Sequence, residues 1–198
     1  MTTPQLQQRL LAHLRELARP RHALWDRLGL MSVRSTIREQ LGALGEVEEH
    51  PFREGSEAGT NLILRLPGQN PQRAPLLVAA HYDGPFNSIG ADDNASGVAA
   101  LLELAQRWAL DPPTRPVWIV AFDQEEWGML GRRALARELR AAGQPLRLMV
   151  SLEMLAYTSA EQAYPIPAMR RIYGRWAAMC APRCCRCSMA AGACPMCA

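Results

Sequence analysis

Hydrophobic positions recur along the first part of the chain at two different periods, and each period predicts a different kind of element. Leucines follow the spacing of one helix face over 4–18, which predicts an amphipathic helix that ends at Pro20. A second helix is predicted over 33–43. Leucines alternate with other residues over 59–68, and this stretch closes with Pro-Gly, so it predicts a strand followed by a turn.

Three continuous apolar runs come next, and helical patterns separate them. The runs over 75–83, 115–123 and 145–155 have no polar face, which is typical of strands buried on both sides. Helices are predicted between them, over 95–110 and 129–142. This alternation predicts an α/β fold, a three-layer sandwich in which helices flank a mixed, mainly parallel sheet.

The stretch HYDGPFNSIGADDNASG, residues 81–97, gathers one histidine and three aspartates around small residues. His81 and Asp83 are two apart at the end of a strand, so they share a face, and a carboxylate can orient a metal-binding imidazole from there. Asp92 and Asp93 are adjacent carboxylates that repel one another unless a positive charge lies near them. A helix cap accounts for one of them, but it does not explain why they follow a strand that ends in His-x-Asp.

Carboxylates also follow the other two apolar runs. Glu125 and Glu126 come directly after the second run. Metal-dependent hydrolysis needs one carboxylate on the metal and another that accepts the proton of a water, and adjacent glutamates can divide these roles. A solvated acidic pair in a loop is the alternative interpretation. Glu153 lies inside the third run, where a lone charge is costly unless it is paired or binds a metal.

Three motifs in this order resemble those of the M28 zinc aminopeptidases. They are HYDGPFNSIGADDNASGVAALLELA, AFDQEEWGMLG and SLEMLAY, and the resemblance covers roughly residues 59–157. It implies the zinc-peptidase fold without its C-terminal portion. It also implies a hydrolase that removes N-terminal residues from peptides with a metal-activated water.

The resemblance further implies a two-zinc site with four metal ligands in this sequence: His81, Asp92, Glu126 and Glu153. Asp92 would bridge the two ions, Glu125 would be the general base, and Asp83 would orient the imidazole of His81. Asp93 would stabilise the loop beside the bridge. The family supplies its last ligand from a late histidine, and no His follows residue 81 here. One well-formed zinc site is therefore expected.

The chain changes character after residue 157. Residues 1–157 are predicted to form the peptidase domain, with N-terminal helices in about 1–45 and a motif-bearing core in about 59–157. The remaining stretch, 158–198, has no usable apolar period, and the sequence predicts a tail rich in arginine and cysteine.

All six cysteines lie between Cys180 and Cys197. Two C-x-x-C pairs, which begin at Cys184 and Cys194, permit a structural zinc site. Only six residues separate the pairs, which is fewer than in common zinc modules. An unselected tail that arose by truncation or a shift of reading frame is therefore the favoured interpretation.

Composition narrows the partners and the location. The net charge is +3 and the arginines are scattered, which argues against a nucleic-acid surface. No apolar run reaches the roughly 18 residues of a membrane span, and the N-terminus lacks a signal-peptide pattern. We expect a peptide substrate, no nucleic-acid or membrane partner, and a cytoplasmic location; the oligomeric state stays open.

Two other functions fit the same motifs. The first is a catalytically impaired homologue that keeps the fold and at most one well-formed zinc site. The second is an acyl-transfer enzyme similar to the glutaminyl cyclases, which share the fold and also use a late histidine.

Overall fold

The computed structural model describes residues 3–157. By its internal contacts the chain divides into Met1–Tyr157 and Thr158–Ala198, so the cysteine-rich tail and the interpretation of its cysteines lie outside the described residues. The elements of the first unit are, in chain order, α1 (Thr3–Leu17), α2 (Arg27–Gly42), β1 (Val47–Glu54), β2 (Glu57–Leu66), β3 (Leu76–His81), the helical turn η1 (Ala91–Ser96), α3 (Gly97–Leu110), β4 (Val117–Phe122), α4 (Leu130–Ala141) and β5 (Leu148–Ser151).

The strands form one mixed sheet in the order β1-β2-β4-β3-β5. The strands β3, β4 and β5 are parallel neighbours, while β2 is antiparallel to both β1 and β4. Four of the five described strands therefore run in one direction. The carboxyl ends of β3, β4 and β5 meet at one edge, where an open α/β sheet places its site.

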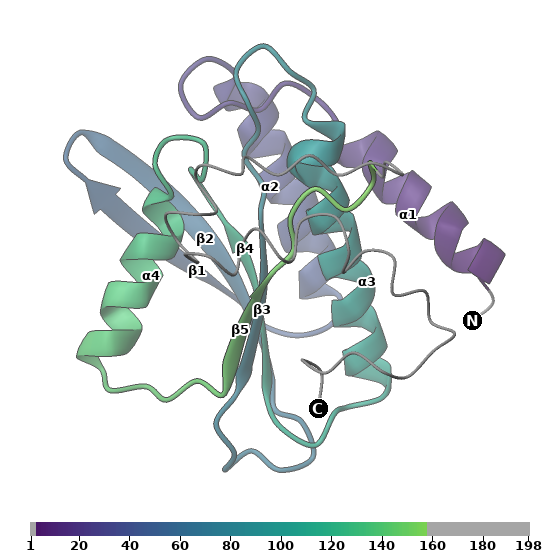
Figure 1. Cartoon of the computed structure of the whole chain (residues 1–198), viewed down its shortest axis with the longest axis vertical. Coiled ribbons are helices and arrows are strands. Elements are labelled where there is room, and N and C mark those ends of the chain that lie inside the picture. The colour runs from purple at the N-terminus through teal and green to yellow at the C-terminus, as the bar shows by residue number, and fades with distance from the viewer. Residues whose placement is uncertain (1–2, 158–198) are drawn as a thin grey trace, which may run out of the picture. The chain divides into compact units, whose positions relative to one another are not determined.

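The side chains of the central strands alternate between two cores, one on each face of the sheet. Val78 and Ala80 of β3 pack in a core with side chains of α1, α2 and α3. Leu77 and Ala79 point the other way and pack with Leu135 of α4. Figure 1 shows α4 on one side of the sheet and the other three helices on the opposite side. The predicted three-layer α/β sandwich is confirmed.

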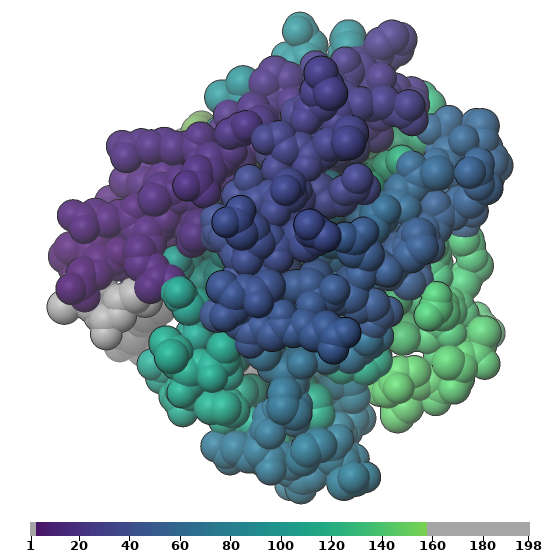
Figure 2. All heavy atoms as spheres, turned by 180° about the vertical axis from the view of Figure 1, so that it is seen from behind, coloured from purple at the N-terminus to yellow at the C-terminus, as the bar shows by residue number. Residues whose placement is uncertain are grey.

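The N-terminal helices cover one face of this unit. Seen from behind, purple and dark-blue atoms of the N-terminal residues occupy much of the surface (Figure 2). The helix α2 begins at Arg27, six residues before the predicted start. Its first turn packs against the preceding chain, because Gly29 has no Cβ to collide with the carbonyl of Pro20.

Strand β1 has no counterpart among the predicted elements. Its sequence VEEHPFRE is mostly polar, and only His50 and Phe52 are buried. Pro51 argues against a central strand, but β1 pairs only with β2 among the described strands, and an edge strand accepts proline. The signal for this strand in the sequence is weak, because only one of its faces is buried and its apolar positions barely alternate.

Strand β5 differs from its prediction in length and burial. It spans four residues, Leu148–Ser151, and all four are exposed. The third apolar run predicted a longer strand buried on both faces. Within residues 3–157, β5 is hydrogen-bonded to β3 alone and forms the edge of the sheet. The apolar run therefore predicted the strand, but not its surroundings.

Candidate metal centre

The acidic and imidazole side chains gather at the carboxyl ends of three parallel strands. His81 is the last residue of β3, Glu125 and Glu126 follow β4, and Glu153 follows β5. Asp93 joins them from η1, which precedes α3. Residues up to 72 positions apart thus reach one place, because parallel strands end at the same edge.

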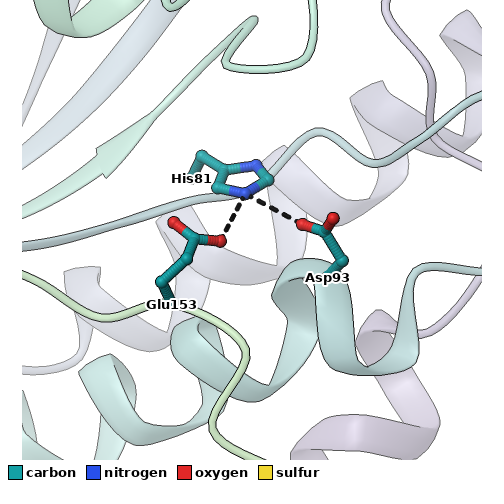
Figure 3. A group of neighbouring side chains, drawn as sticks. All are labelled: His81, Asp93 and Glu153. Carbon is teal, nitrogen blue, oxygen red and sulfur yellow. Dashed lines mark hydrogen bonds and ion pairs between the residues drawn. The ribbon is translucent and has the colours of Figure 1, made fainter. Parts of the chain in front are cut away.

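His81 is the centre of the cluster and is 3% exposed. Its Nε2 lies 3.0 Å from Oε1 of Glu153 and 3.2 Å from Oδ1 of Asp93. Figure 3 shows the two carboxylates converging on this nitrogen from different elements. The other ring nitrogen, Nδ1, lies 3.2 Å from Oδ1 of Asp83. Carboxylates therefore hold both edges of the imidazole.

Asp83 connects the histidine to the glutamate pair. Its carboxylate is fully buried, and Oδ1 accepts a hydrogen bond from the backbone amide of Glu125 at 3.0 Å. Its Oδ2 accepts another from the amide of Glu126 at 3.0 Å. One carboxylate thus orients the imidazole of His81 and fixes the backbone that carries both glutamates.

The structure places Asp93, not Asp92, beside His81. The carboxylate of Asp92 points away and accepts hydrogen bonds from the backbone amides of Ala156 at 2.8 Å and Tyr157 at 3.3 Å. Asp92 was expected to be the metal ligand that bridges the ions beside His81, and in the structure Asp93 lies there instead. The physical reason is local backbone: Asp93 has non-helical angles (φ −102°, ψ 95°) inside η1, so the two neighbouring side chains diverge.

Residues of η1 also form hydrogen bonds with the segment that carries Glu153. Asn94 is fully buried, donates to the carbonyl of Leu152 at 2.8 Å and accepts from the amide of Met154 at 3.2 Å. The hydroxyl of Ser96 accepts from the amide of Leu155 at 2.8 Å. Glu153 lies between two of these anchored residues, so its position depends on η1.

The charges in the cluster perturb one another. Burial by itself lowers the pKa of His81, but hydrogen bonds to Asp83 and Glu153 outweigh it, and the pKa is raised to about 10. Burial and the negative charge of Asp93 raise the pKa of Glu126 to about 7. These carboxylates are thus crowded enough to favour a positive charge among them.

The donor set fits a zinc ion. Two groups of residues could each hold a metal ion: His81 with Asp93 and Glu153, and His81 with Glu125 and Glu126. Within each group the ligand atoms all lie within 4.8 Å of one another. Imidazole nitrogen and carboxylate oxygen are ligands that zinc accepts. In addition, Oε1 of Glu126 is buried and has no hydrogen-bond partner in the described part of the chain. An unpartnered buried carboxylate oxygen is costly, and a bound cation would satisfy it.

From the sequence, Asp93 was expected to stabilise the loop, and no role was expected for Asn94 or Arg21. The signal for Asp93 was present, since it stands beside the aspartate that was chosen. Arg21 is fully buried under the site, and its backbone acceptors Tyr82 and Ile89 lie 61 and 68 residues away. No local pattern could have marked it.

Aromatic side chains border the cluster. Trp127 follows Glu126 directly, and its ring packs edge-to-face with that of His22, with centroids 6.1 Å apart. Phe86 packs on the same histidine at 6.0 Å and on Trp25 at 5.8 Å. The three larger rings are 45–67% exposed, so they form an exposed apolar surface that starts at Trp127, the residue after Glu126.

Comparison with known families agrees with this geometry. The family model described as Peptidase family M28 matches residues 61–179, which is more than half of the chain. The chain belongs to peptidase family M28. The resemblance drawn from the three motifs is thereby confirmed, and the cluster lies on residues within the matched region.

Curated relatives are similar over part of their length. The uncharacterized protein YfbL of Escherichia coli is 38% identical over 117 residues, which are 52% of this chain and 36% of that protein. A probable zinc metalloprotease of Pyrenophora tritici-repentis is 33% identical over 122 residues, 58% of this chain and 28% of that protein. The chain thus spans roughly a third of the length of these relatives.

Solved structures share the fold at low identity. A Zn-dependent exopeptidase from Parabacteroides distasonis superposes with a TM-score of 0.63 and 19% identity, over 81% of this chain and 64% of that one. A glutaminyl cyclase from an Acidobacteriales bacterium gives a TM-score of 0.66 and 19% identity, over 84% and 65%. The two classes of enzyme therefore share this fold, and the fold does not distinguish them.

The expected cytoplasmic location is contradicted and is withdrawn. A relative from Schizosaccharomyces japonicus, 38% identical over 76 residues, is named vacuolar membrane protease, and relatives from other yeasts carry the same name. Among the described residues, no helix combines the length and the apolar character that crossing a membrane requires.

Proposed function

We propose that this chain is a zinc-dependent peptidase that removes N-terminal residues from peptides. One observation carries the proposal: the imidazole of His81 and the carboxylates of Asp93 and Glu153 converge at a strand edge beside a second carboxylate pair. Membership in peptidase family M28 supports the reaction class.

His81, Asp93 and Glu153 would hold one zinc ion, which matches the three protein ligands of a catalytic site. When bound, zinc would polarise the substrate carbonyl and promote ionisation of a water. Glu125 and Glu126 form a second group with His81. Among the described residues, this group has no third ligand of its own, because His81 already belongs to the first group. One tightly bound zinc per chain is therefore proposed.

Glu125 is proposed as the general base. The carboxylate of Asp83 accepts a hydrogen bond from the backbone amide of Glu125 and also contacts the imidazole of His81. Asp83 therefore fixes the position of the base relative to the imidazole. Glu125 would accept the proton of the attacking water and donate it to the amine of the leaving peptide, which requires a carboxylate within reach of both.

The test compares Glu125→Gln with Glu46→Gln, a change at an exposed glutamate away from the site. We expect Glu125→Gln to lower hydrolysis of aminoacyl nitroanilides by at least about 100-fold with bound zinc unchanged, since Gln cannot accept the proton. Glu46→Gln should behave as the wild type. Equal loss of zinc and activity in Glu125→Gln would mean that Glu125 is a ligand.

The same experiment separates the alternatives. Cyclisation of a peptide with N-terminal glutamine, without nitroanilide hydrolysis, would favour acyl transfer of the glutaminyl-cyclase type. One equivalent of zinc with neither activity would favour a non-catalytic homologue that retains the site.

An apolar N-terminal side chain is the proposed preference. Trp127 follows Glu126 directly, its ring joins those of Phe86 and Trp25 through His22, and an apolar side chain that covers these exposed rings removes apolar surface from water. Leucyl and phenylalanyl nitroanilides should therefore be cleaved faster than glutamyl nitroanilide, and Trp127→Ala should narrow the difference. An unchanged ratio in Trp127→Ala would place the side chain elsewhere.

A further inference from the structure

Arg21 is a fully buried cation, and within residues 3–157 no carboxylate is among its hydrogen-bond partners. It lies just after α1 and is 1% exposed. Buried arginines usually pair with acidic groups, because an unpaired charge is costly to bury. The guanidinium instead donates to six backbone carbonyls in the described part of the chain: those of Leu17, Arg19, Tyr82, Ile89, Gly90 and Asp93.

These acceptors belong to three segments that meet under the candidate metal centre. Nε donates to the carbonyl of Tyr82 at 2.8 Å, and Tyr82 stands between His81 and Asp83. The terminal nitrogens donate to the carbonyls of Ile89 at 2.6 Å and Gly90 at 2.8 Å, in the loop before η1, and to that of Asp93 at 3.4 Å, inside η1. One side chain therefore ties the end of β3 to the residue whose carboxylate faces the imidazole.

Two glycines leave room for this guanidinium. A Cβ on Gly84 would lie 3.2 Å from Cζ of Arg21, and a Cβ on Gly90 would lie 2.8 Å from one of its terminal nitrogens. Gly90 also has a positive φ of 53°, which favours glycine. The backbone around the site is thus shaped to enclose Arg21.

The charge of Arg21 also matters to the cluster. Burial lowers the pKa of its guanidinium, and the negative charges of Asp83, Asp93 and Glu126 oppose that shift. Because Arg21 donates to carbonyl oxygens, none of the three carboxylates is occupied by a direct hydrogen bond from it. The carboxylates are partly neutralised while their oxygens remain available.

We infer that Arg21 is a positioning residue for the metal centre, which sets the distance between His81 and Asp93 by fixing the backbone of both segments. It touches neither substrate nor metal. The inference rests on the proposed zinc site, but not on peptidase activity, because metal binding alone reports on it.

The experiment measures zinc affinity by chelator competition and the visible spectrum of the Co²⁺-substituted protein, well below the melting temperature. Arg21→Lys keeps the charge but has one compact ammonium in place of a planar fork. We expect zinc affinity to fall by about 10- to 100-fold, the usual effect of losing an outer-shell partner, and the cobalt spectrum to change. The control is Arg19→Lys, since Arg19 is half-buried and its side chain donates to the hydroxyl of Ser32 and the carbonyl of Glu16.

Two further variants keep the inference testable if Arg21→Lys folds poorly. Gly84→Ala retains Arg21 but crowds its guanidinium, and we expect a smaller loss of zinc affinity in the same direction. In Arg21→Ala, millimolar guanidinium should partly restore the cobalt spectrum, whereas tetramethylammonium, which has the charge but no donors, should not.

Wild-type zinc affinity and cobalt spectrum in Arg21→Lys would overturn the inference, even with a lower melting temperature, because Arg21 would then stabilise the fold alone. A wild-type chain that binds neither metal would overturn the inference and the proposed function together. Metal binding without turnover would count against the proposed function only, and the comparison of Arg21→Lys with the wild type would still decide the role of Arg21.

Discussion

At the scale of single residues, Asp92 and Asp93 are chemically identical neighbours with opposite surroundings. The carboxylate of Asp93 faces Nε2 of His81 at 3.2 Å, whereas that of Asp92 accepts from the amide of Ala156 at 2.8 Å. The irregular backbone of η1 separates them. One aspartate is therefore placed to hold a cation, and the other anchors a distant segment.

The pair offers a matched test. Asp93→Asn should reduce zinc affinity by more than about 100-fold, because it removes a ligand and outer-shell changes alone cost 10- to 100-fold. Asp92→Asn should bind zinc like the wild type, since an amide oxygen can still accept from Ala156. Chelator competition measures both. A large loss in Asp92→Asn with none in Asp93→Asn would return the ligand role to Asp92.

Asp123 is a buried carboxyl whose raised pKa should make the stability of the fold depend on pH. It is 2% exposed, its Oδ2 accepts from the amide of Thr60, and its Oδ1 has no partner in the described part of the chain. Burial raises the pKa of Asp123 from 3.8 to about 6, against the opposing hydrogen bond from Thr60. The folded state therefore binds a proton that the unfolded state releases between about pH 4 and 6.

The sign of the pH dependence follows from this raised pKa. Below about pH 4 the carboxyl is neutral in both states, and above about pH 6 the folded state bears a buried charge. The free energy of unfolding should thus fall by about 3 kcal/mol across this range through Asp123 alone. In the chelator-treated protein, Asp123→Asn should be more stable than the wild type at pH 7.5, with little difference at pH 4. Urea unfolding measures both, and a difference independent of pH would contradict the assignment.

Residue types at the site were predictable from the sequence, because metal chemistry requires particular donors at strand ends. His81, Glu125, Glu126 and Glu153 were found in this way, and the structure brings them together. The choice between two adjacent aspartates was not predictable, because it depends on dihedral angles in an irregular turn.

At the scale of elements, η1 connects the metal cluster to the segment after β5 through hydrogen bonds. Asn94 makes most of this connection, since its side chain accepts hydrogen bonds from the amides of Met154 at 3.2 Å and Gly97 at 3.1 Å and donates one to the carbonyl of Leu152. Without it, the segment that carries Glu153 would be held by the short edge strand β5 and by the hydrogen bonds from the amides of Leu155 and Ala156 to Ser96 and Asp92.

Asn94→Ala should loosen that segment. The change leaves two backbone amides and one carbonyl without their partner, which should cost about 2–4 kcal/mol of stability. Hydrogen exchange at the amide of Met154 should accelerate, and zinc affinity should fall because Glu153 is no longer held. The control is Asn70→Ala, which removes one hydrogen bond to Gln72 in an exposed turn. Unchanged exchange at Met154 would show that β5 and the hydrogen bonds to Ser96 and Asp92 order the segment without Asn94.

Elements were predictable wherever burial imposed a strong period. The two-sided burial of β3 and β4 produces continuous apolar runs, and α1 and α3 show a helix face. The strand β1 was missed because it buries only one face at the sheet edge, and the exposure of β5 was missed because an apolar run does not say what covers it.

At the scale of the whole molecule, the candidate site is assembled by tertiary structure from segments that are remote in sequence. Peptidases and glutaminyl cyclases share this architecture, so the chemistry depends on the side chains at one sheet edge. The sequence has no histidine after His81, and its cysteines all lie in the separate unit Thr158–Ala198. The zinc content of the entire chain must therefore be assigned either to the sheet edge or to the cysteines.

Metal removal answers that question. A ligand that binds only the folded state stabilises it by about 2.7 kcal/mol at 100 times its dissociation constant, which for a domain of this size raises the melting temperature by about 5–10 °C. We expect chelation to lower the melting temperature by that amount and to release one zinc per chain.

A variant with all six cysteines replaced by Ser should show the same shift and the same stoichiometry, because the proposed ligands are His81, Asp93 and Glu153. Calorimetry and metal analysis measure both quantities. Loss of one zinc and a markedly lower melting temperature in the cysteine-free chain would instead place a structural zinc site among the cysteines, since metal binding and folding are linked.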